Sequence, residues 1–167
     1  MNLLEPFHQI STFIFDIDGV WTNSQLLITE EGHLLRSMNT RDGYAAKKAL
    51  AEDYRICVIT GGNSLGVEKR MRALGVRDYY SGVHDKLDVY KNYVEGLQLN
   101  EEEILFMGDD LPDYPPMRRV GLPVCPADAA PEIKSICRYI SPFNGGEGCV
   151  RDVIEKVLKL KDLWHER

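Results

Sequence analysis

Three short polar segments carry residues whose types and spacing could do chemistry. They are Asp16-Ile17-Asp18-Gly19, Thr60-Gly61-Gly62 and Gly108-Asp109-Asp110. Asp16 and Asp18 are two residues apart, so on an extended segment their side chains share a face. Clustered carboxylates repel one another unless a hard cation neutralises them, and oxygen ligands at an open site favour Mg²⁺. The pattern predicts a magnesium site that includes Asp16, Asp18 and Asp109.

Two further residues supply groups that a phosphoryl substrate needs. Thr60 offers a hydroxyl beside glycine amides that can hold phosphate oxygens, and Lys86 offers a positive charge. Two carboxylates at this spacing support a scheme in which Asp16 attacks phosphorus and forms an aspartyl-phosphate. Asp18 then protonates the leaving alcohol and later takes a proton from the hydrolytic water. Mg²⁺ and Lys86 offset the charge on the transferring group.

Each segment also has a simpler interpretation. Paired aspartates often cap helices, a Thr-Gly pair after a strand is commonly a turn, and a single lysine is usually solvated. Their order along the chain, most of them directly after a predicted strand, favours the catalytic interpretation.

The elements that must position these residues follow from apolar periodicity. Buried strands are predicted at residues 12–15, 55–59, 104–107 and 122–125, with short strands at 79–80 and 139–140. Helices are predicted at about 44–52 with Asp42 as its cap, 67–74, 87–97, from 115, 132–137 and 150–160. This alternation predicts an α/β fold, a Rossmann-like three-layer α/β/α arrangement around a parallel sheet. In such sheets ligands bind at the carboxyl ends of the strands.

Length and composition restrict the remaining classes of protein. The chain of 167 residues fits a single domain, 1–167, and its net charge of −6 argues against a nucleic-acid partner. The first residues lack a secretory signal, and no window approaches a membrane span. The four cysteines show no CxxC spacing. We therefore expect a cytoplasmic protein with reduced thiols and no membrane partner.

These motifs resemble those of the haloacid dehalogenase superfamily of phosphotransferases. More closely, the chain resembles the capless branch that contains the 3-deoxy-D-manno-octulosonate 8-phosphate phosphatases. The most specific matches are DIDGVWT (16–22), NTRDGY (39–44), GVHDK (82–86), GDDLPD (108–113) and GGEGCVR (145–151). The resemblance runs from about residue 13 to residue 151.

The resemblance implies a role for each matching acidic residue. Asp16 is the nucleophile and Asp18 the acid/base. Mg²⁺ is held by Asp16, the backbone carbonyl of Asp18 and Asp109. Either Asp110 or Asp113 supports the metal shell.

The resemblance also implies the groups that bind substrate. Thr60, Gly61 and Lys86 bind the phosphoryl group. The positions that match contacts to the sugar acid are Asn39, Thr40, Arg41, Asp42, Gly43, Lys47 and Arg70.

One difference from the sequences of this branch leaves the choice between two classes of substrate open. Many relatives have arginine directly after the Thr-Gly pair, where this chain has Gly62. A nine-carbon sugar acid phosphate, 2-keto-3-deoxynononate 9-phosphate or N-acylneuraminate 9-phosphate, is therefore an alternative to the eight-carbon substrate. A non-catalytic binding module is a second alternative, which the intact acidic motifs disfavour.

The segments 23–38 and 61–85 are too short to hold the cap domain of larger relatives. The first predicts a β-hairpin with apolar residues on both faces. Capless relatives form tetramers in which a neighbour covers each site, so we expect a homo-oligomer, with a hairpin that folds back on its own domain as the alternative. Residues 145–148 are either a flap that reaches an active site or a plain entry to the last helix.

Overall fold

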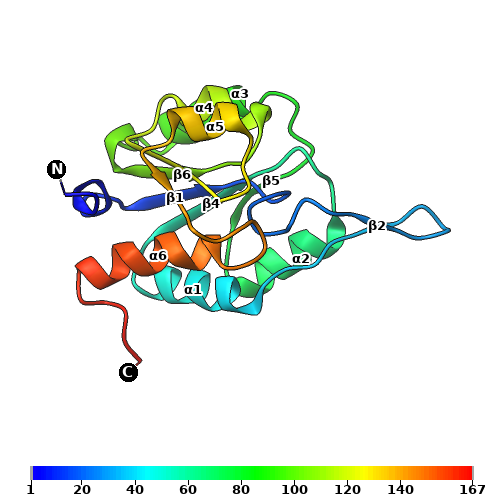
Figure 1. The fold of residues 1–167 in the computed structure, drawn as a ribbon, viewed down its shortest axis with the longest axis horizontal. Coiled ribbons are helices and arrows are strands. Elements are labelled where there is room, and N and C mark those ends of the chain that lie inside the picture. Colours follow the sequence, from blue (N-terminus) through cyan, green and yellow to red (C-terminus); the bar gives the residue numbers. More distant parts are fainter. Residues whose placement is uncertain (1, 167) are drawn as a thin grey trace.

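A parallel sheet forms the centre of the molecule, with helices on both faces (Figure 1). The structure, a computed structural model, describes residues 2–166. The strands lie in the order β5-β4-β1-β6-β7-β8 and all neighbours are parallel. They are β1 (Thr12–Phe15), β4 (Arg55–Ile59), β5 (Asp78–Tyr80), β6 (Ile104–Met107), β7 (Leu122–Cys125) and β8 (Tyr139–Ile140).

Three helices cover each face of the sheet. One layer contains α1 (Thr40–Ala51), α2 (Leu65–Leu74) and α6 (Cys149–Leu160), and the other contains α3 (Lys86–Gly96), α4 (Tyr114–Met117) and α5 (Pro131–Ile136). Short 3-10 turns lie at Glu5–Phe7, Glu101–Glu103 and Leu111–Asp113. The predicted three-layer α/β/α fold is confirmed.

Successive side chains of a strand point to opposite faces of the sheet, which divides the core into two halves. Phe13 and Phe15 of β1 belong to the cluster formed with α1, α2 and α6, whereas Ile14 belongs to the cluster formed with α3, α4 and α5. All three side chains are fully buried. Because both faces of β1 are covered, its unbroken apolar run is the pattern expected of a central parallel strand.

The predicted cap of α1 is wrong. The helix begins at Thr40, and Asn39 caps it by accepting a hydrogen bond from the Arg41 backbone N–H at 2.8 Å. Asp42 lies inside the helix on the face that meets α6, where its Oδ1 accepts from the Arg151 backbone N–H at 2.9 Å. The amide donors at the start of α6 need acceptors, and the buried Asp42 carboxylate supplies one from another helix.

A small hairpin projects away from the three layers (Figure 1). It consists of β2 (Leu27–Ile28) and β3 (Leu34–Leu35), which pair antiparallel. Leu27 and Ile28 are 69% and 67% exposed, so the hairpin does not fold back to bury them. Segment 61–85 holds α2, β5 and their connections.

The loop before α6 packs against the loop after β1. The Gly146 N–H donates to the Val20 carbonyl at 3.0 Å. A Cβ atom on Gly145 would lie 2.0 Å from the carbonyl oxygen of Gly19, so only glycine permits this approach. The packing agrees with the helix-entry interpretation of residues 145–148. Within residues 2–166, none of the helices has the length and apolar character that a membrane crossing requires.

Candidate active site

The loops that follow β1, β4 and β6 meet at one edge of the sheet, as their parallel pairing requires. They surround a cavity of about 510 Å³. Seven of its lining residues were predicted from the sequence: Asp16, Asp18, Thr60, Gly61, Lys86, Asp109 and Asp110. Asp113, expected in a supporting position, lines it as well.

Lys86 lies at the first position of α3 and points into the acidic part of the cavity. Its Nζ atom is 2.9 Å from Oδ1 of Asp16 and 2.7 Å from Oδ1 of Asp113. Burial opposes the charged form of Lys86, but the charges of Asp113 and Asp16 outweigh it and raise the lysine pKa above its usual value. Lys86 is therefore a fixed positive charge beside the Asp16 carboxylate.

The loops after β1 and β6 approach one another closely at Gly19 and Asp109. A Cβ atom on Gly19 would lie 1.9 Å from Oδ2 of Asp109, and the φ of +93° at Gly19 also favours glycine. Asp113 holds the second loop, because its Oδ2 accepts from the Asp109 backbone N–H at 3.1 Å. Gly19 thus permits the distance between Asp16 and Asp109 that a shared ligand requires.

The donor set fits a hard divalent cation. Asp16, Asp109 and Asp113 each bring one carboxylate oxygen to within 4.8 Å of the others. Burial raises the pKa of Asp16 to about 6, and burial together with neighbouring carboxylate charges raises the pKa values of Asp109 and Asp113 to about 7. Lys86 supplies one positive charge against three carboxylates. A cation with oxygen preference, such as Mg²⁺, would relieve the remaining repulsion.

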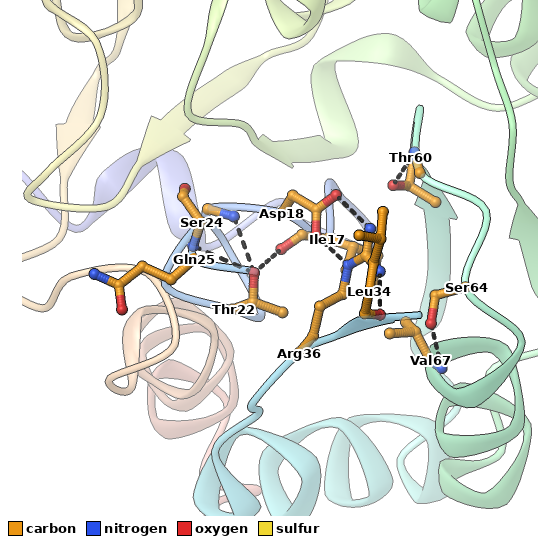
Figure 2. Close-up of polar contacts among 12 residues, drawn as sticks. Ile17, Asp18, Thr22, Ser24, Gln25, Leu34, Arg36, Thr60, Ser64 and Val67 are labelled. Atoms are coloured by element: carbon orange, nitrogen blue, oxygen red, sulfur yellow. Dashed lines mark hydrogen bonds and ion pairs between the residues drawn. The ribbon is translucent and has the colours of Figure 1, made fainter. Parts of the chain in front are cut away.

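The Asp18 carboxylate is not part of this cluster and binds Arg36 instead, contrary to the prediction that it joins Asp16 and Asp109. Its Oδ1 accepts from Nε of Arg36 at 2.7 Å and its Oδ2 from Nη2 at 3.3 Å. Figure 2 shows the guanidinium rising from the end of the hairpin to meet the carboxylate. Asp113 takes the third place in the carboxylate cluster.

Thr60 directly follows β4 and is only 2% exposed. Its hydroxyl accepts from the Gly62 backbone N–H at 3.2 Å, and its own N–H donates to the Tyr80 carbonyl at 2.9 Å. The hydroxyl and the neighbouring Gly61 lie at the wall of the same cavity. This arrangement can present a hydroxyl donor to an anion beside Lys86.

The predicted sugar-acid contacts do not line this cavity. Asn39 caps α1, and the others, Thr40, Arg41, Asp42, Gly43 and Lys47, lie within this helix. Asn39 and Asp42 are used as helix caps, and Asp42 is fully buried. Arg70 of α2 packs over Gly43, where a Cβ atom would lie 2.7 Å from its Nη2. Arg70 also lines a neighbouring groove.

Sequence reasoning missed Arg36 at the site. Within residues 19–38 it is the only lysine or arginine, and that isolation was the available signal. Ser24 and His84 line the cavity and were also not predicted there.

Comparisons with known proteins point to one family of hydrolases. The model of the haloacid dehalogenase-like hydrolase family matches residues 79–154. A 3-deoxy-D-manno-octulosonate 8-phosphate phosphatase of Yersinia pestis is 35% identical over 161 residues, which are 96% of this chain and 86% of the relative.

Solved structures are similar over the same length. The crystal structure of the Yersinia pestis phosphatase has a TM-score of 0.93 at 34% identity, covering 96% of this chain and 87% of that one. The phosphatase of Moraxella catarrhalis, in complex with a magnesium ion, a phosphate ion and a KDO molecule, has a TM-score of 0.90 at 27% identity. That match covers 94% of this chain and 90% of the other.

Proposed function

This chain belongs to the haloacid dehalogenase-like hydrolases, in the branch of the 3-deoxy-D-manno-octulosonate 8-phosphate phosphatases, and we propose on that basis that it hydrolyses this phosphate ester to KDO and phosphate. The observation that carries the proposal is the position of Lys86 between two carboxylates, 2.9 Å from Asp16 and 2.7 Å from Asp113. It keeps a cation beside a carboxylate nucleophile in the interior of the cavity.

Asp16 attacks the phosphorus atom and forms an aspartyl-phosphate, and the alcohol of KDO leaves. Its 2.9 Å contact with Lys86 and the hydrogen bond from the Ile17 N–H to Oδ1 at 2.7 Å fix the orientation of the carboxylate. Lys86 and the Thr60 hydroxyl bind the phosphoryl oxygens. The charge of Lys86 and the hydrogen bond from Thr60 stabilise the transition state most strongly, because negative charge moves toward the leaving oxygen there.

Asp18 is the acid/base of the proposal. It donates a proton to the leaving alkoxide and then accepts one from the water that attacks the aspartyl-phosphate, so the same carboxyl serves both steps. Its side chain is 37% exposed and is paired with Arg36, from which it would turn to reach the reacting group.

Asp16 and Asp109 would hold Mg²⁺ together with the backbone carbonyl of Asp18, and Asp113 would support them through Lys86 and the Asp109 N–H. When bound, Mg²⁺ would neutralise charge on the phosphoryl oxygens. The presence of a magnesium ion in the Moraxella catarrhalis phosphatase supports this assignment.

The proposal includes an assembly of several copies, with a tetramer as its expected form. The hairpin supports it, because β2 and β3 expose Leu27, Ile28, Leu34 and Leu35 by 45% or more. A cavity without a lid admits water and discriminates weakly among phosphate esters, so a neighbouring copy would supply the missing cover. We also propose that 1–167 is one domain, as its single continuous six-stranded sheet suggests. The free cysteines suit a reducing, cytoplasmic location.

The decisive experiment measures phosphate release by the purified protein with Mg²⁺ from KDO 8-phosphate and from nine-carbon sugar acid phosphates. We expect the highest kcat/KM for the eight-carbon compound. Asp16→Asn should lower that value by at least about three orders of magnitude. Asp152→Asn, a buried carboxylate on α6 outside the cavity, is the matched control and should stay near the parent. No turnover of any of these esters would refute the proposal, and a preference for nine carbons would reassign its substrate.

A further inference from the structure

A groove of about 960 Å³ runs between β3 and the start of α2, beside the active-site cavity. Gly62 lines both spaces, so they adjoin at the end of β4. The lining of the groove includes two guanidinium groups, Arg36 and Arg70, and no carboxylate. An anionic end of a substrate whose phosphate lies beside Lys86 would meet positive charge in this direction.

Arg36 is the more confined of the two guanidinium groups. Its side chain is 8% exposed, and its charged partner is the Asp18 carboxylate, which it binds through Nε and Nη2. Its Nη1 donates to the Leu34 carbonyl at 3.3 Å, within the return strand of the hairpin. Figure 2 shows this side chain between the hairpin and the carboxylate. The guanidinium is thus held in one orientation at the boundary of groove and cavity.

The space for this arrangement exists because residue 62 is glycine. A Cβ atom there would lie 3.0 Å from Oδ2 of Asp18 and 3.1 Å from Nη2 of Arg36. Either neighbour would have to move to admit a side chain. Gly62, Arg36 and Asp18 therefore form one unit, in which the missing side chain leaves room for a guanidinium supplied by the hairpin.

The resting contact and the proposed chemistry compete for the same carboxylate. Asp18 must turn toward the reacting phosphoryl group to act as acid/base, yet the Nε and Nη2 atoms of Arg36 hold both of its carboxylate oxygens. A nearly buried guanidinium that lost this partner would be left uncompensated, which is costly. A carboxylate on the substrate can replace Asp18, because it offers the same planar pair of oxygens.

We propose that Arg36 binds the substrate's carboxylate and that this exchange of partners releases Asp18, which takes up a proton from solvent water and gives it to the leaving alkoxide. The proposal rests on the proposed function, since it concerns the same phosphate ester. It makes Arg36 the residue that distinguishes sugar acid phosphates from neutral sugar phosphates. A phosphate ester without a carboxylate leaves Asp18 paired with Arg36 and turns over slowly.

The test compares KDO 8-phosphate with its C1 carboxamide. The two compounds share the leaving alcohol and its need for an acid, and differ in the negative charge at C1. In the parent protein we expect a higher kcat/KM for the carboxylate form. In Arg36→Gln the ratio of the two kcat/KM values should fall by about 10- to 100-fold, the range expected for losing a charged hydrogen-bonded pair.

Two further variants keep the result interpretable. Arg119→Gln removes an exposed arginine that contacts Glu101 at 2.7 Å, remote from the cavity, and should leave the ratio unchanged. Arg36→Lys retains the charge without the planar pair of donors, so its ratio of kcat/KM values should lie between those of the parent and Arg36→Gln. It serves as the test if the glutamine variant does not fold.

The other outcomes separate the two proposals. Equal losses for both compounds in Arg36→Gln would overturn the exchange and make Arg36 a positioning residue for Asp18. If Arg36→Gln changed neither the ratio nor the individual kcat/KM values, the contact between Arg36 and Asp18 would only stabilise the position of the hairpin. A parent protein inactive on both compounds would instead refute the proposed function.

Discussion

Lys86 and Asp113 come from two different elements and meet at 2.7 Å in the interior of the site. Asp113 is fully buried, and its second carboxylate oxygen accepts from the Asp109 backbone N–H. Asp110, by contrast, is exposed and accepts from its neighbour Leu111. Of the two candidates for supporting the metal shell, the contacts favour Asp113.

Asp113→Asn should weaken Mg²⁺ binding by about 10- to 100-fold, because it removes a charge that orients both Lys86 and the Asp109 loop. The measurement is the Mg²⁺ concentration for half-maximal phosphate release, supported by calorimetric titration. Asp110→Asn is the matched control and should have a smaller effect. A larger effect of Asp110→Asn would reverse the assignment.

Asp18→Asn should slow the first turnover of KDO 8-phosphate by about 10²- to 10⁴-fold, since the alkoxide then leaves without a proton. p-Nitrophenyl phosphate has a leaving group that needs no acid, so its first turnover should stay fast. Rapid-mixing measurements should show a burst of p-nitrophenol equal to the enzyme concentration, followed by slow hydrolysis of the aspartyl-phosphate. Equal slowing of both first turnovers would contradict the role of Asp18.

Leu27 and Ile28 are 69% and 67% exposed within one chain. Replacing both by lysine should convert the protein to monomers, because charged side chains would interrupt the apolar surface of the hairpin. Sedimentation analysis gives the mass of each form. Leu3→Lys, at an exposed leucine far from the hairpin in sequence, is the control and should keep the mass of the parent. A parent protein that sediments as a monomer would rule out the assembly.

Gly145→Ala should destabilise the protein by about 1–3 kcal/mol, since its Cβ atom would lie 2.0 Å from the Gly19 carbonyl oxygen and force the loop after β1 to move. Urea denaturation measures the change. In Gly96→Ala, at the end of α3 with no atom within 4 Å of the new Cβ, the free energy of unfolding should be unchanged or higher. Similar destabilisation in both would show that the close approach has no special cost.

Asp42 should impose a pH dependence on stability. Burial raises its pKa from 3.8 to about 6, so between these values the folded protein binds a proton more readily than the unfolded chain. The contribution of Asp42 to stability therefore falls as the pH rises through this window. Asp42→Asn keeps an acceptor for the Arg151 N–H without titrating. Above pH 6 it should be more stable than the parent by on the order of 2–3 kcal/mol.

Chemical denaturation of both proteins in the presence of EDTA, from pH 4 to pH 8, measures this difference. The advantage of Asp42→Asn should close as the pH falls from 6 to 4. Glu31→Gln, which removes one carboxylate at the exposed tip of the hairpin, is the control variant. A constant difference for Asp42→Asn would contradict the pKa assigned to Asp42.

The sequence was most informative where periodicity and motif coincide. The buried strands at 12–15, 55–59, 104–107 and 122–125 have the predicted bounds, because each is a short apolar run followed by polar residues. The order of the motifs was sufficient to bring Asp16, Thr60, Lys86 and Asp109 to one cavity, since parallel strands place their carboxyl ends at the same edge.

Contacts between distant side chains were not predictable in the same way. Asp42 was expected to cap its own helix, yet it caps α6 from 109 residues away in sequence. Arg36 lies 18 residues from Asp18 in sequence, and no local pattern encodes that the hairpin brings the two side chains together. The choice between Asp110 and Asp113 depended on which way a short 3-10 turn faces.

The central place of β1 in the sheet has a consequence for synthesis on the ribosome. Thr12 of this strand pairs with Arg55 on one side and with Ile104 on the other, so its apolar residues precede both partners by long stretches of chain. Parallel pairing of this kind forms slowly, because long loops must close, at a cost in chain entropy, before the stabilising contacts form. The emerging polypeptide therefore carries an uncovered hydrophobic strand until β6 has left the exit tunnel, which makes β1 a natural segment for chaperone binding.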